Sequence, residues 1–174
     1  VEACLNARPE ARSAVWVILA RSVRSAQVGS EWPASINTAL AGDLEALGTE
    51  IVSSAQTSTD RMLTLRIVTA LADLVLALPW PDLAALKAFE HALEAEGAAI
   101  RAPIQHLAAA IDQVEVRLAR ARAAENRAYE PDLAAALNTL AIRLSETGDR
   151  AGAVAPAQED VTLRRAPAAE NRAY

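Results

Sequence analysis

The residues that could carry catalysis or bind a metal ion are few and lie far apart in the sequence. His91 and His106 are the only histidines, they fall on different expected helices, and no cysteine cluster accompanies them. A zinc site needs several such ligands converging on one point, so no metal site is expected. Cys4 has neither a histidine nor a helix start nearby to activate its thiol. His106 stands among apolar neighbours and is expected to be partly buried.

The acidic residues form no recognisable acid–base arrangement. The sequence contains no Walker phosphate loop, dinucleotide fingerprint or nucleophile elbow. The carboxylates on expected helices are interpreted as solubilising surface groups: Glu94, Glu96, Asp112 and Glu115. We therefore expect a non-catalytic protein without a cofactor. The alternative is an enzyme with a cryptic site within residues 1–80.

Composition favours packed helices and argues against nucleic acid as a partner. Of the 174 residues, 52% are hydrophobic and only 3% are aromatic, which suits helices better than sheets. The formal charge of −5 opposes binding to a polyanion, because duplex binders need a dense basic face. The nearest basic cluster is interpreted as a solvated helix end: Arg117, Arg120, Arg122 and Arg127. One cysteine cannot form an internal disulfide, and a cytoplasmic location fits.

Apolar spacing predicts an N-terminal helical region over residues 1–80, with helices at about 9–26, 33–54 and 61–78. The third is apolar nearly all round, which is typical of a central helix in a bundle. The apolar run 62–80 is long enough to span a membrane, but Arg66 and Asp73 would be costly in lipid. Membrane insertion is therefore not expected.

The strongest pattern is an internal repeat. Ala-Ala-Glu-Asn-Arg-Ala-Tyr occupies residues 123–129 and returns 45 residues later at 168–174. Pro-Asp-Leu-Ala-Ala opens two further expected helices, at 81–96 and from 131 to just before Gly148. Proline and an acid at the start, with glycine past the end, have the polarity of a helix. A second helix follows each of these, at about 103–124 and 149–165.

The second helices align at the 45-residue offset. Five residues match five others in order: Gln113, Val116, Leu118, Arg120 and Ala121 match Gln158, Val161, Leu163, Arg165 and Ala166. Two helix pairs, residues 81–129 and 131–174, follow from this alignment. We therefore expect an all-α fold in which the N-terminal helical bundle leads into an α-solenoid of antiparallel helix pairs. Because Tyr129 leads directly into the next unit, further units are also expected after Tyr174.

The segment Leu-Asn-Thr-Leu-Ala-Ile-Arg-Leu at 137–144, followed by Gly-Asp-Arg-Ala-Gly-Ala at 148–153, resembles a tetratricopeptide repeat of the kinesin-light-chain variety. The resemblance covers residues 131–174 closely and 81–129 more loosely. It implies close helix approach at Ala141 and Ala153, with leucines 137, 140 and 144 packed between helices and Gly148 in the turn. Glu90 replaces Ala141 in the looser copy, implying wider packing there, and Pro156 implies a late or bent second helix. A HEAT- or armadillo-like array is the alternative.

Such repeats bind peptides or protein segments in a concave groove, and this resemblance implies two matching sets of groove residues. They are Lys87, His91 and Glu94 in one pair and Asn138, Ile142 and Ser145 in the other. Lys87 and Asn138 would hold a peptide carboxylate or backbone. The alternative interpretation is that Lys87, His91 and Glu94 form only the wet face of an amphipathic helix.

The leading hypothesis is therefore a protein-interaction scaffold, an adaptor or sensor region of a larger multidomain signalling or defence protein, with a protein or peptide as its partner. The second hypothesis is an oligomerisation or assembly module that uses the leucine-rich helices at 33–54 and 61–78. Self-association of the chain in solution would distinguish it from the first.

Overall fold

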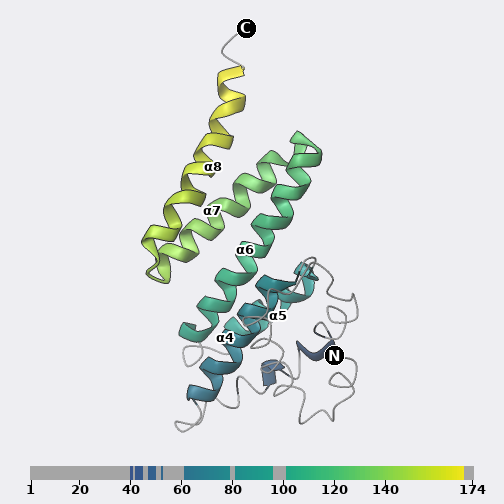
Figure 1. Ribbon diagram of the computed structural model, residues 1–174, viewed down its shortest axis with the longest axis vertical. Coiled ribbons are helices and arrows are strands. Elements are labelled where there is room, and N and C mark those ends of the chain that lie inside the picture. The colour runs from purple at the N-terminus through teal and green to yellow at the C-terminus, as the bar shows by residue number, and fades with distance from the viewer. Residues whose placement is uncertain are drawn as a thin grey trace. The chain divides into compact units, whose positions relative to one another are not determined.

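The computed structural model describes residues 40, 42–44, 47–49, 52, 61–78, 81–95 and 101–170. Every regular element in these residues is helical, which confirms the all-α prediction (Figure 1). The elements are α4 (Arg61–Ala77), α5 (Leu83–Ala95), α6 (Arg101–Glu125), the 3₁₀ helix η1 (Arg127–Tyr129), α7 (Glu130–Glu146) and α8 (Arg150–Glu170). The helix expected at 9–26 lies outside the described residues, and the one at 33–54 is described only in part.

Two of the helices begin at aspartates that cap their first turns. Asp82 precedes α5, and its Oδ1 accepts a hydrogen bond of 3.0 Å from the backbone N–H of Ala85. Asp149 caps α8 in the same way, accepting from Gly152 at 2.8 Å. Each aspartate satisfies a donor in the first turn that has no partner within its helix. Gly148 takes a φ of 90° in the turn after α7, the left-handed region that glycine enters most easily.

Of the two outcomes predicted from Pro156, a late start or a bend, the late start was wrong, because α8 includes this proline. It begins at Arg150 and runs to Glu170, five residues beyond the expected end. A proline within a helix removes the hydrogen bond to the carbonyl four residues earlier and crowds it. That residue is Gly152, which has no side chain to add to the crowding. The start is therefore set by the Asp149 cap and not by the proline.

The chain divides into two compact units, residues 1–111 and 112–174, with the division inside α6. In the first unit, the buried described side chains of α4, α5 and early α6 include Val68, Leu71, Leu74, Leu86, Phe89, Leu93 and Leu107. Leu65 and Leu76 of α4 are exposed, so that helix keeps one open apolar edge. The predicted boundary at residue 80 stays a prediction, since residues 79 and 80 lie outside the described ones.

The second unit is built from the end of α6, α7 and α8. Its core contains Val116 and Ala119 of α6 and the α7 residues Leu133, Ala136, Leu137 and Leu140. Leu144 and, from α8, Leu163 pack against this core from its edges. Leucines 137, 140 and 144 thus pack between helices, as the repeat pattern implied. Helices α7 and α8 lie side by side after the tight turn at Gly148 (Figure 1). An α-solenoid over both units stays a prediction.

Candidate functional site

A groove of about 490 Å³ lies between α7 and α8. Its α7 wall carries Asn138, Ala141, Ile142, Ser145 and Glu146, and its α8 wall carries Arg150, Ala153, Val154 and Ala157. Three residues predicted for peptide binding, Asn138, Ile142 and Ser145, therefore line one groove.

The two faces of α7 explain this placement. Its leucines at 133, 137 and 140 are buried in the core of the unit. Asn138, Ile142 and Ser145 follow an i, i+4, i+7 spacing on another face, and all three are exposed. Small side chains at Ala141 and Ala153 form part of the two walls. Burial of the leucine face thus fixes the rotation of α7 and turns the other three side chains into the groove.

The groove combines apolar contact area with polar groups at its margins. Ile142 and Val154, from opposite walls, are each 51% exposed, although such side chains gain free energy when buried. Asn138 offers an amide that can both donate and accept hydrogen bonds, and Ser145 offers a hydroxyl. Glu146 and Arg150 add one charge of each sign. This arrangement suits a peptide segment that inserts an apolar side chain and whose backbone forms hydrogen bonds with the groove.

The other predicted site residues lie on α5, in the first unit. His91 and Glu94 are exposed there, and Lys87 is half-buried with its Nζ 3.9 Å from Oε2 of Glu90. These three share a helix face with the spacing of their α7 counterparts. A single groove made of all six residues stays a prediction, because α5 and α7 belong to different units.

The aligned residues of α5 and α7 also share their burial. Leu86 and its counterpart Leu137 are buried, and so are Phe89 and Leu140. Glu90 is buried as well, at the position that Ala141 occupies in the second pair. The two first helices therefore use the same face for their cores. Whether Glu90 widens the packing of its pair stays a prediction.

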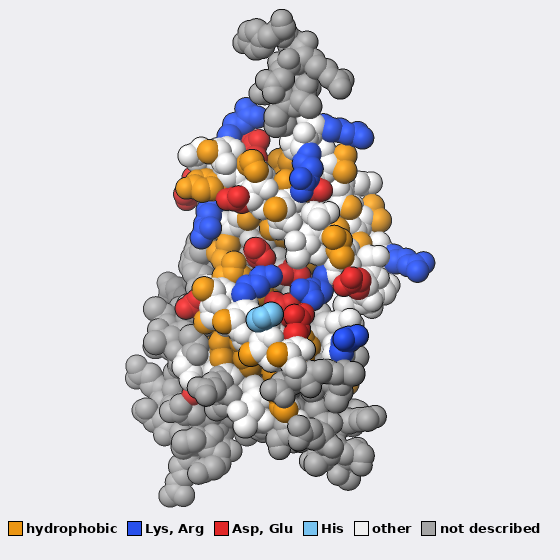
Figure 2. All heavy atoms as spheres, turned by 180° about the vertical axis from the view of Figure 1, so that it is seen from behind, with side chains coloured by type: hydrophobic (Ala, Val, Ile, Leu, Met, Phe, Trp, Pro, Cys, Tyr) orange, Lys and Arg blue, Asp and Glu red, His pale blue; other side chains and the backbone are white. Residues whose placement is uncertain are grey.

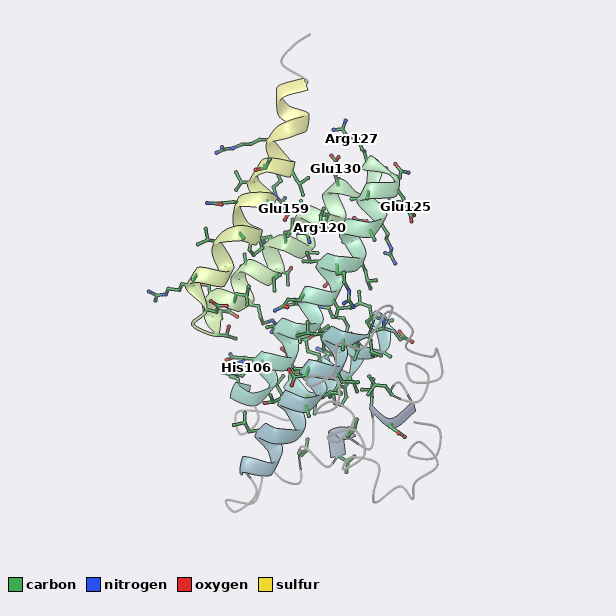
Figure 3. The ribbon with its side chains drawn as sticks, in the orientation of Figure 1. His106, Arg120, Glu125, Arg127, Glu130 and Glu159 are labelled. Carbon is green, nitrogen blue, oxygen red and sulfur yellow. The ribbon has the colours of Figure 1, made fainter. Side chains whose placement is uncertain are left out.

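Charged side chains of the second unit pair across its helices. Arg120 of α6 makes a bidentate contact with Glu159 of α8, at 2.7 Å from Nη2 and 3.3 Å from Nε (Figure 3). Arg127 contacts Glu130 at 2.9 Å across the turn between α6 and α7. Two members of the expected basic cluster are thus engaged by carboxylates. Desolvation lowers the pKa of Arg117, but arginine stays charged in proteins.

Positive and negative side chains are interspersed on the face drawn in Figure 2. That face presents apolar side chains between the charges, and the described side chains drawn there form no continuous basic stripe of the kind that tracks a phosphate backbone. No helix among the described residues is long and apolar enough to cross a membrane.

His106 is exposed on α6, so the expectation of partial burial was wrong. Its apolar neighbours Ile104 and Leu107 are buried, but successive residues point in different directions around a helix, which leaves His106 on the outer side. Among the described residues, no group of three or more His, Cys, Asp and Glu side chains is placed to hold a metal ion.

Sequence reasoning missed the α8 wall of the groove. Val154 and Arg150 sit in a helix whose sequence shows weak amphipathic character, and Val154 was assigned no role. The available signal was a larger apolar residue among the alanines in the first half of this helix. A second cavity, of about 250 Å³, lies between the start of α7 and the end of α8 and includes Leu163 and Arg164.

Comparisons of the chain with protein-family models, curated proteins and solved structures found no match.

Proposed function

We propose that the chain is a non-catalytic protein-interaction scaffold, whose α7–α8 groove binds an extended peptide segment of a partner protein. The observation that carries this proposal is the pair Ile142 and Val154, which face the same groove from two helices and are each 51% exposed. Exposed apolar side chains gathered in a concave surface are typical of binding sites. The tetratricopeptide-like pattern of residues 131–174 adds the expectation of a peptide as ligand.

The chemistry of the groove suggests how such a peptide is held. An apolar side chain inserts between Ile142 and Val154, while the Asn138 amide bonds to the peptide backbone. Arg150 at one margin attracts an acidic side chain or a carboxylate terminus. The ligand class is thus an extended segment with an apolar anchor and, beside it, charges that match Glu146 and Arg150.

A displayed library of random peptides, selected against the full chain, tests the proposal. A selected peptide is then measured by fluorescence anisotropy against variants of the chain. Ile142→Asp removes apolar contact and places a charge in the groove, so we expect about a tenfold loss of affinity or more. Thr139→Asp is the matched control, because Thr139 is exposed on the same helix but does not line the groove. Equal binding to Ile142→Asp and to the unchanged chain contradicts the groove assignment.

A second candidate function is self-assembly through α4. Leu65 and Leu76 are 41% and 37% exposed on one edge of this helix, which buries Val68, Leu71, Leu74 and Val75. Light scattering of the full chain separates the two functions. A monomer at high concentration argues against assembly, whereas oligomers that Leu76→Glu dissolves support it.

A further inference from the structure

The outer face of α8 corresponds to a face of α6 that is covered in this structure. Both helices end at matching glutamates, Glu125 and Glu170, 45 residues apart. The repeat alignment therefore assigns Val161 to the position of Val116, and Arg165 to that of Arg120. Because these residues all belong to the second unit, their surroundings can be compared directly.

On α6, residues of this face contact both α7 and α8. Val116 is 4% exposed and packs in the core with Leu133 and Leu137 of α7. Arg120 reaches past α7 to Glu159 of α8, as Figure 3 shows. On this face of α6, the valine thus contacts α7 through apolar packing, and the arginine contacts α8 through an ion pair.

On α8, the equivalent residues face solvent. Val161 is 43% exposed, about ten times as much as Val116, and Arg165 is exposed too. Leu163 meanwhile packs inward against the core, so the inner side of α8 is already in use. The outer side of α8 therefore carries a valine and an arginine at the same positions as α6, but none of the described helices covers its valine.

Two differences from α6 define what this face accepts. Ala157 stands where α6 has Asp112, so a helix covering it needs no counterpart to Arg143. Arg164 stands where α6 has the buried Ala119, and its Nε lies 2.5 Å from Oδ1 of Asp160 on the same helix. The methylene groups of Arg164 add apolar surface near Val161. A partner helix that packs there needs a small side chain opposite Arg164.

We propose that the outer face of α8, defined by Val161, Arg164 and Arg165, binds a helical hairpin of a partner protein. The first helix of that hairpin presents leucine and alanine side chains to Val161, and the second supplies a carboxylate to Arg165. The surface overlaps the peptide groove, because Ala157, which the covering helix would contact, also lines that groove and Val161 follows the groove residue Val154 at i+7. A hairpin on this face and a peptide in the groove therefore exclude each other. The face gives the scaffold a second partner, recognised by helical shape and charge.

The test uses a labelled peptide of residues 127–170 as the hairpin probe, since that segment carries both the leucine face and Glu159. Fluorescence anisotropy measures its binding to the full chain. Val161→Glu places a charge under the covering helix, and we expect at least about a tenfold weaker affinity. Ala151→Glu adds the same charge to α8 ten residues earlier, away from Arg165. Ala151 matches His106, which is exposed on α6, so this control leaves the affinity unchanged.

A charge exchange gives an independent readout. A probe with Glu159→Arg loses affinity for the natural chain and regains it on the Arg165→Glu chain. Circular dichroism of each variant verifies that the fold is kept. No binding of the probe, or equal binding to Val161→Glu, overturns the proposal. If the chain alone forms dimers and Val161→Glu dissociates them, the face binds a second copy of the chain. That result also overturns the proposal.

Discussion

Nε of Arg143 lies 2.9 Å from Oδ2 of Asp112, and the Asp112 side chain is completely buried. This ion pair joins α6 to α7 beside the leucine core of the second unit. A buried carboxylate is costly to desolvate, and a guanidinium at hydrogen-bond distance offsets much of that cost. The pair therefore matters more for what its disruption would cost than for any net gain over an apolar pair.

Arg143→Leu removes the cation that faces the buried Asp112, and we expect a loss of about 3–5 kcal/mol in the free energy of unfolding. Urea unfolding followed by circular dichroism measures the change. All three tryptophans (at 16, 32 and 80) lie in the first unit, so tryptophan fluorescence followed in parallel shows whether that unit is affected.

The surface pair provides the control. Arg127→Leu disrupts the contact with Glu130 at a side chain that is 71% exposed, and such pairs contribute about 0–1 kcal/mol. The double variant Asp112→Leu/Arg143→Leu recovers most of the lost stability, because it leaves no buried charge. A similar cost for Arg143→Leu and Arg127→Leu would contradict the importance assigned to burial.

Gly148→Ala is expected to destabilise the second unit by about 1–2 kcal/mol, because an alanine at a φ of 90° carries left-handed strain. Thermal unfolding followed by circular dichroism detects it. The matched control is Gly42→Ala, since a Cβ at this helical glycine meets no atom within 4 Å. There the higher helix propensity of alanine raises stability by about 0.5–1 kcal/mol. Equal signs at the two glycines would contradict the assigned turn geometry.

Gly152 and Asp149 are expected to show coupled effects. A Cβ at residue 152 would collide with the Asp149 carboxylate, so Gly152→Ala displaces the cap and costs about 1 kcal/mol. In an Asp149→Ala background the collision is gone, and the same change stabilises α8 by about 0.5–1 kcal/mol through helix propensity. Urea unfolding of the four chains measures this double-mutant cycle. Additive effects would show that the cap and the glycine are independent.

The sequence predicted the helices from α4 to α8 well because their signals are local. Asp82 and Asp149 cap their helices, Gly148 ends α7, and the apolar spacing of α5 and α7 gives the correct buried faces. The three α7 residues of the groove follow from the same spacing, since burial of one helix face determines which residues remain outside.

Longer-range features could not be predicted in this way. Asp112 and Arg143 are 31 residues apart, and their contact depends on the relative rotation of two helices, which no local pattern fixes. Asp112 was interpreted as a surface carboxylate, and it is fully buried. The prediction that His106 is partly buried was wrong for a related reason, because its neighbours in sequence are not its neighbours around the helix.

The Asp112–Arg143 pair occurs in only one copy of the repeat, since the aligned positions hold Ala157 and Ala92. Helices as alike as α6 and α8 offer α7 two similar surfaces, and repeat proteins are prone to domain swapping and misassembly for this reason. If α7 docked on the wrong helix or shifted by one turn, the Asp112 carboxylate would lose Arg143. The ion pair thereby fixes the register of α7 on α6 at a single position of the second unit.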